Sequence, residues 1–192
     1  MNTRIATVAG LLLCAVASPG LAQAVLQAAP STRATAEVAL TPAGAMPGDA
    51  TPPRLIRLDY GQPHLRGRTL HTDSLVPWDQ PWRLGANNAT TLRTDVPLGL
   101  GGASLDAGTY VLEALPSRGT WMLLVRRITG TNAEGENILA DPVSVPLRRR
   151  ELPQPVESLT MWLIPSRQPG QARGELRFAW GMSELATDWV VR

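Results

Sequence analysis

The residues best suited to bind a ligand are concentrated in one segment, residues 75–91. It contains two Trp, two Pro and one Arg, a mixture typical of an ordered loop rather than of a regular helix or strand. Trp78 and Trp82 can present flat apolar faces to a sugar ring or a peptide, and Arg83 and Asn87 can donate hydrogen bonds to it. We therefore predict a contact surface around this loop.

The predicted contact surface also includes two residues that precede the loop. Its members are Tyr60, Arg68, Trp78, Trp82, Arg83 and Asn87. In the alternative interpretation the loop plugs one end of the fold. Both Trp side chains are then buried, as large aromatic residues are on average, and Arg83 pairs with a carboxylate such as Asp59. Replacing Trp82 with alanine separates the two hypotheses, because ligand affinity falls in the first case and only stability falls in the second.

Enzyme chemistry has little support in the sequence. There is no Gly-x-Ser-x-Gly nucleophile elbow and no His-Glu-x-x-His zinc helix. His64 and His71 lie seven residues apart in a turn-rich segment, and we interpret both as exposed loop residues, because a zinc site needs several converging ligands. A hydrolase that uses a pair of carboxylates, or His64 with Asp59 and neighbouring acids, is the enzymatic alternative. We expect no metal, no cofactor and no catalytic residue.

Charge and composition argue against several other classes. All 18 basic residues are Arg, and the formal net charge is +2. A nucleic-acid-binding protein would show a concentrated basic face, and the lack of Lys excludes Schiff-base chemistry. We interpret the one basic run, residues 148–150, as a solvated strand end or turn, because a phosphate-binding surface needs more than one local cluster.

The N-terminal segment has the organisation of a Sec-type export signal. Arg4 supplies the positive charge, residues 5–17 are almost wholly apolar, and residues 22–24 provide the small side chains of a cleavage site. The apolar run is shorter than the about 20 residues that a membrane-spanning helix needs. Leu13 is bulky where lipoprotein signals place a small residue, which argues against lipidation of Cys14. We therefore expect a periplasmic or secreted protein with no integral membrane segment in its mature chain.

Three regions follow one another along the chain. We predict a signal peptide over residues 1–24, a flexible tether over residues 25–53 and one folded domain over residues 54–192. The tether is rich in Ala, Pro, Thr and Gly, and it buries too little surface to offset its ordering entropy. A short pairing of residues 37–40 with the domain is left open.

Within the domain the hydrophobic period is two, the period of β-strands. Alternating or β-rich runs cover residues 56–60, 109–115, 120–125, 156–164, 175–180 and 187–191, and residues 99–102 and 106–108 have the composition of turns. Trp121, Phe178 and Trp180 are predicted to lie in the core. We therefore predict an all-β fold, a single antiparallel β-sandwich of jelly-roll-like or immunoglobulin-like type.

Several blocks together carry a resemblance to a known family. They are residues 58–63 (LDYGQP), 66–68 (RGR), 75–77 (LVP), 82–87 (WRLGAN), 89–91 (ATT), 105–112 (LDAGTYVL), 155–160 (PVESLT) and 176–180 (LRFAW), with Pro116 and Trp121. In this order and spacing, the chain from about Arg54 onward resembles the exported bacterial family known as domain of unknown function 2911. The resemblance implies an exported, mainly β domain and brings no established activity, substrate or catalytic residue.

The chain departs from that family at two positions and in one segment. Asn88 stands where similar proteins commonly carry Glu, and Gly181 stands where an acidic residue is usual. The segment over residues 126–145 is a loose match. A family role that uses those two carboxylates would be lost in this protein.

The sequence therefore favours an exported, non-enzymatic module that binds a ligand or associates with the cell envelope. Its expected partners are a glycan, a cell-wall fragment or another small molecule. The hydrolase described above is one alternative. A structural envelope subunit is another, and a contiguous exposed apolar patch would mark it.

Overall fold

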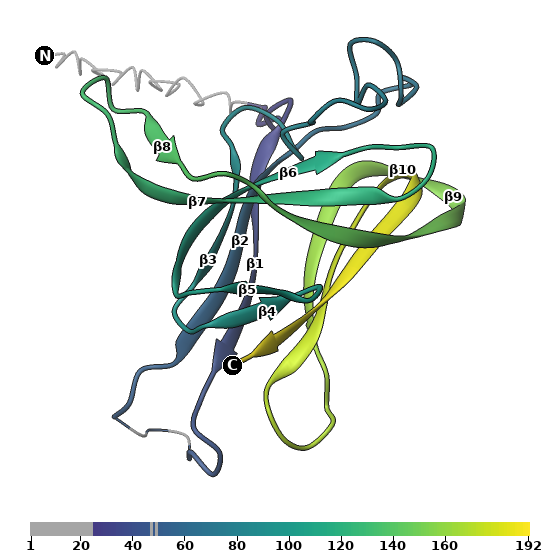
Figure 1. Ribbon diagram of the computed structural model, residues 1–192. Coiled ribbons are helices and arrows are strands. Elements are labelled where there is room, and N and C mark those ends of the chain that lie inside the picture. Colours follow the sequence, from purple (N-terminus) through teal and green to yellow (C-terminus); the bar gives the residue numbers. More distant parts are fainter. Residues whose placement is uncertain (1–24, 47, 49) are drawn as a thin grey trace, which may run out of the picture.

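The computed structural model of the chain describes residues 25–46, 48 and 50–192 (Figure 1). The predicted signal peptide, residues 1–24, lies outside these residues. The described part contains no helix, which confirms the predicted all-β class. Accordingly, none of its elements is a helix long and apolar enough to cross a membrane.

The described residues form ten strands, with the two longest at the C-terminal end. They are β1 (Thr32–Leu40), β2 (Arg54–Gln62), β3 (Thr90–Thr94), β4 (Leu98–Leu100), β5 (Ala103–Leu105), β6 (Gly108–Leu115), β7 (Trp121–Thr131), β8 (Asn137–Leu139), β9 (Val143–Pro165) and β10 (Arg173–Val191). The predicted turns lie between β4 and β5 and between β5 and β6.

All neighbouring strands pair antiparallel, in the order β1-β2-β3-β6-β7-β9-β10-β4-β5, and β8 pairs with β7 outside this path. The sheet is continuous because β9 is long enough to have two partners. Its first residues, 143–147, pair with β7, and from Arg148 onward it pairs with β10.

The sheet also curves until β9 meets β2 again. The Leu65 N–H donates to the Glu157 carbonyl at 2.8 Å, and the Leu159 N–H donates to the Pro63 carbonyl at 3.0 Å. The buried Tyr60 hydroxyl accepts a hydrogen bond from the Met161 N–H at 3.0 Å. These contacts join β9 to β2 and to the start of the loop that follows it.

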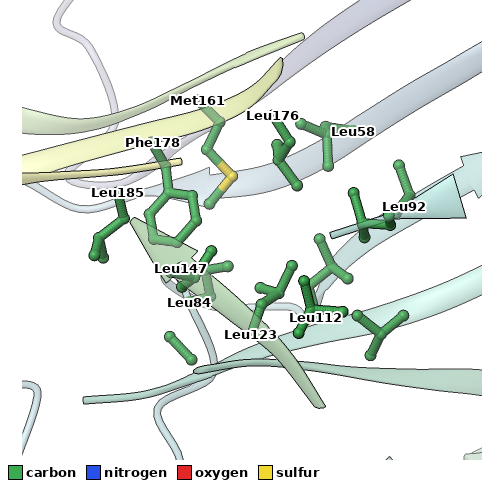
Figure 2. Packing of buried hydrophobic residues seen from close by; sticks show 14 of the residues in the cluster. Leu58, Leu84, Leu92, Leu112, Leu123, Leu147, Met161, Leu176, Phe178 and Leu185 are labelled. Atoms are coloured by element: carbon green, nitrogen blue, oxygen red, sulfur yellow. The ribbon is translucent and has the colours of Figure 1, made fainter. Parts of the chain in front are cut away.

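The core lies between the two halves of this curved sheet. Figure 2 shows leucines of β2, β3, β6 and β7 facing side chains of β9 and β10, among them Met161 and Phe178. The predicted core residues Trp121, Phe178 and Trp180 are all buried. Burial alternates along β2, where Ile56, Leu58 and Tyr60 are buried, as expected of a strand with one face in the core. In the middle of β10 both faces are buried, over residues 178–181.

The prediction of a flexible tether is wrong for part of residues 25–53. Thr32–Leu40 form β1, which pairs with β2 along its whole length. The inward positions of β1 are small, with only Val38 fully buried, so the segment has the composition of a linker. Backbone pairing and two ion pairs, Arg33 with Asp59 and Arg57 with Glu37, attach it to the sheet.

Candidate functional site

The longest connection between strands in the described part is the loop over residues 63–89, between β2 and β3. Backbone hydrogen bonds tie the loop to the sheet. Trp82 exchanges two bonds with Ala114 of β6, at 2.7 and 2.8 Å, and the Ala86 N–H donates to the Gly61 carbonyl at 3.2 Å. The loop is therefore an ordered part of the fold, as its composition predicts.

The loop holds an unusual amount of backbone strain. Every non-glycine residue with positive φ in the described part lies in it: Arg66, His71, Val76, Asp79, Leu84 and Asn87, with φ between 50° and 63°. For the β-branched Val76 this conformation is a true outlier. Such strain persists where the surroundings over-determine the backbone, and it is concentrated at functional sites.

Aromatic rings fasten the loop to the core. The His71 imidazole stacks on the Trp78 indole, with centroids 3.9 Å apart and planes at 17°, and both rings meet the edge of Trp121. The Trp82 indole stacks on that of Trp180, with centroids 5.7 Å apart. Both loop tryptophans are half-buried. Each stacks on a ring within the protein, and the Arg118 guanidinium also lies over the Trp78 ring, 5.4 Å from its centroid.

An open cavity of about 380 Å³ lies beside these rings, and we name it the loop cavity. Its loop wall consists of Leu65, Arg68, Thr69, Leu70 and His71. Its sheet wall consists of Arg149, Pro155, Gly181, Met182 and Ser183. Leu70, His71 and Ser183 also line a much smaller apolar hollow beneath it, bounded by Trp82, Trp121 and Phe178.

The sheet wall exists because the pairing of β9 and β10 is interrupted there. Gly181 pairs with Val156 and Ser183 pairs with Glu151, so residues 152–155 of β9 stand opposite Met182 alone. Two of those residues are prolines, which have no N–H to donate to a strand ladder. The sequence thus opens the sheet at the place where the loop approaches it.

The family described as protein of unknown function (DUF2911) matches residues 49–188. The chain belongs to this family. The resemblance inferred from the sequence blocks is therefore confirmed. Neither a curated protein nor a solved structure matches the chain.

The DUF2911 match covers every residue of the loop cavity and none of β1. The fold brings two of the sequence blocks that resemble the family into contact. Gly61, from the block over residues 58–63, touches Ala86, from the block over residues 82–87. The parts of the chain that carry the family signal therefore meet at the base of the loop.

His71 is half-buried in this DUF2911 protein, not exposed as the sequence interpretation had it. Its Nδ1 lies 3.1 Å from the Val76 carbonyl, an arrangement in which Nδ1 carries the proton and Nε2 is an acceptor. Burial lowers the pKa of His71, and the positive charge of Arg149 lowers it further, although the hydrogen bond to Val76 opposes both. The imidazole is therefore neutral at pH 7.

Because the pKa of His71 is lowered from its ordinary value of 6.5, this residue makes stability depend on pH. The unfolded chain takes up the proton first as the pH falls below that value, so the free energy of unfolding decreases toward acid. We expect the wild type to lose stability between about pH 7.5 and about pH 5, and His71→Gln to lose less. Urea unfolding at the two pH values measures the difference, and equal losses would contradict the assignment.

The six residues of the predicted contact surface do not share one surface. Arg68 lines the loop cavity, whereas Tyr60 is buried in β2. Arg83 and Asn87 point to another side of the loop, where the Arg83 guanidinium donates to the Asn87 carbonyl at 3.2 Å and the Asn87 amide donates to the Ser31 carbonyl at 3.2 Å. Trp78 stacks on His71, which lines the cavity, and Trp82 lines the small hollow beneath it.

The residues of the hydrolase alternative have other partners. Asp59 pairs with Arg33, and His64 Nδ1 lies 2.6 Å from the Ser158 hydroxyl. Neither lines the loop cavity. Within the described residues, no group of three His, Cys, Asp or Glu side chains could hold a metal ion.

Sequence reasoning missed the sheet wall of the cavity, and above all Arg149. This residue belongs to the run that we interpreted as solvated, and it is exposed as expected, but it also lines the cavity. The missed signal is the period of two along the strand. Arg149 is the next alternate position after Val145 and Leu147, which are both buried.

Proposed function

We propose that this protein is an exported, non-enzymatic module that binds a small ligand in the loop cavity. Glycans, cell-wall fragments and other small molecules are the candidate ligands, and the proposed location is the periplasm or the outside of the cell. One observation carries the proposal: the ordered loop, with its strained residue His71, meets an interrupted strand pair and a set of polar groups at one open cavity.

The size and composition of the cavity support this function. Small-molecule sites measure about 300–1,000 Å³ and combine apolar walls with a few polar groups that orient the ligand. The loop cavity of about 380 Å³ has Leu65, Leu70 and Met182 as its apolar part. Arg68 and Arg149 are its charged part.

A second cavity, of about 560 Å³, is larger but less suited to be the site. It lies near the C-terminal end of β10, and three of its residues, Trp189, Val190 and Arg192, fall outside the family match. Its two carboxylates, Glu175 and Asp188, already pair with Arg148. These two carboxylates are therefore engaged within the protein, which makes them less suited to bind a ligand.

The test is a ligand screen read by NMR on the isotopically labelled protein. Glycans, peptidoglycan fragments and small acids, amines and alcohols are added singly, and we expect at least one to shift the amide resonances of residues 65–71 and 181–183. Shifts confined to other parts of the protein, or no shift at millimolar concentration, would contradict the proposal.

A bulky substitution separates cavity binding from other binding. Met182 lines the cavity and is 42% exposed. The larger side chain in Met182→Trp should therefore fill the cavity without overpacking the core. Ile164 on β9 is similarly exposed, at 38%, and does not line the cavity, so Ile164→Trp is the matched control. Binding should be lost in the first variant and kept in the second.

A further inference from the structure

The orientation of Arg149 gives the loop cavity a chemical preference. Directly paired residues of neighbouring strands lie on the same face of the sheet, and Arg149 pairs with Leu185, which is buried. Arg149 is thus an arginine on the core-facing side of β9, at the point where the core ends. Its side chain donates a hydrogen bond to the Ser183 hydroxyl at 3.2 Å.

The two neighbouring arginines behave differently. Arg148 and Arg150 lie on the opposite face of β9, because side chains alternate along a strand. Arg148 pairs with Asp188 and Glu175, and Arg150 pairs with Glu184. The run over residues 148–150 therefore contains two neutralised cations and one cation that faces the cavity.

The cavity has a second cation and no acid. The Arg68 guanidinium donates to the backbone carbonyls of His64, at 2.7 Å, and Leu65, at 3.0 Å. Neither Arg68 nor Arg149 takes part in a salt bridge within the described part of the chain. No Asp or Glu lines the cavity. The site therefore favours a negative charge.

His71 adds an acceptor rather than a third charge. Its Nδ1 is engaged by the Val76 carbonyl, which leaves Nε2 as the acceptor of the ring. A ligand hydroxyl or amine could donate to it. The rest of the lining is apolar, with Leu70, Pro155 and Met182.

We propose that the loop cavity binds a small organic carboxylate. Its carboxylate pairs with the guanidinium groups of Arg149 and Arg68, and its apolar part lies against Leu70 and Met182. A planar guanidinium matches a carboxylate through two parallel hydrogen bonds. The inference rests on the proposed function and adds the class of ligand.

The cavity also limits the size of that ligand. A closed apolar cavity of about 150 Å³ holds one benzene molecule, so an open cavity of about 380 Å³ accommodates an aromatic or short aliphatic acid. The smaller hollow beneath it, of about 20 Å³, has no room for a side group of the ligand.

The test compares acids with neutral molecules of the same shape. Benzoate and hexanoate are titrated against benzamide and hexanamide, with inorganic phosphate as a third arm, and cavity resonances are followed by NMR. We expect each carboxylate to bind about tenfold more tightly than its amide, since a hydrogen bond to a charged group is the stronger kind. Phosphate should bind more weakly than the carboxylates, because it brings no apolar part.

Variants then assign the preference to Arg149. Arg149→Met removes the charge and keeps the length, and it should reduce carboxylate affinity about tenfold while leaving the amides unchanged. Arg150→Met, on the other face of the strand, should change neither. Arg68→Met is the second variant, and it serves alone if Arg149→Met does not fold.

The outcomes separate the two proposals. Equal binding of acids and amides at the cavity, unaffected by Arg149→Met or Arg68→Met, would overturn the carboxylate inference and leave the binding function standing. Tighter binding of phosphate than of the carboxylates would overturn it in favour of a phosphate-bearing ligand. Failure of every probe in this test and in the ligand screen would overturn both.

Discussion

Replacing Gly61 with alanine should lower the free energy of unfolding by about 3 kcal/mol or more, at the upper end of what overpacking costs. A Cβ at this position would lie 1.8 Å from the Ala86 carbonyl oxygen and 2.9 Å from the Ala86 nitrogen. Both are backbone atoms, so relief requires the loop to move away from β2. Urea unfolding monitored by tryptophan fluorescence measures the loss.

Gly119 is the matched control for this substitution. It lies outside the strands, its φ is not positive, and the nearest atom to an added Cβ is the Ser117 hydroxyl oxygen at 3.8 Å. Gly119→Ala should therefore stay within about 0.5 kcal/mol of the wild type. If Gly61→Ala is equally mild, the loop does not rest on β2 as described.

The Gly61 contact also determines where the ligand site can form. The hydrogen bond between Ala86 and Gly61 fixes the end of the loop, and the pairing of Leu65 with Glu157 fixes its beginning. His71 and Leu70 lie between these two anchors and form part of the cavity wall. A loop displaced from β2 should therefore lose ligand binding as well as stability.

The all-β class could be predicted from the sequence because its signal is local. Alternation of apolar and polar residues around Leu58 and Phe178 reports the buried face of each strand directly. The pair of glycines at the turn between β4 and β5 indicates a backbone conformation that other residues rarely adopt, and both Gly101 and Gly102 have positive φ.

The candidate site could be predicted only in part, because it depends on distant contacts. The spacing of Trp78, Arg83 and Asn87 marks an ordered loop, yet spacing in an irregular segment does not reveal which side each residue takes. Burial of His71 depends on Trp121, fifty positions later in the chain. Of β1, only a short pairing of residues 37–40 was left open, because strand pairing uses backbone groups, which composition does not register.

For Arg149, the alternation of side chains along a strand could have indicated a site residue, but the run of three arginines indicated a solvated cluster instead. Three consecutive arginines suggest a solvated cluster, and two of them are paired on the outer face. Strand parity separates the third from its neighbours. Where a charged residue occupies an inward position of a predicted strand, at the end of a run of buried ones, it is therefore better treated as a candidate site residue.

Phe178→Ala should cost about 3–5 kcal/mol of unfolding free energy, the range for removal of a fully buried aromatic side chain. Phe178 is 2% exposed, and Figure 2 shows it among Leu185, Met161 and Leu147 in the core. Its ring belongs to the half of the sheet that faces β2, β3, β6 and β7, so its loss removes contacts across the whole core. Ile138→Ala, at a residue 49% exposed on β8, should be nearly neutral.

The same variant tests whether the small hollow beneath the loop cavity is apolar. Phe178 lines that hollow with Trp82 and Trp121, so truncation of its ring enlarges the hollow into a hole of about benzene size. An apolar hole stays dry and binds benzene, and a ligand that binds the folded state alone raises its stability. Benzene should therefore raise the melting temperature of Phe178→Ala and leave that of the wild type unchanged. A loss below about 1 kcal/mol would mean that the ring does not fill the space between the two halves of the sheet. No response to benzene would mean that the enlarged hollow is not a dry apolar hole.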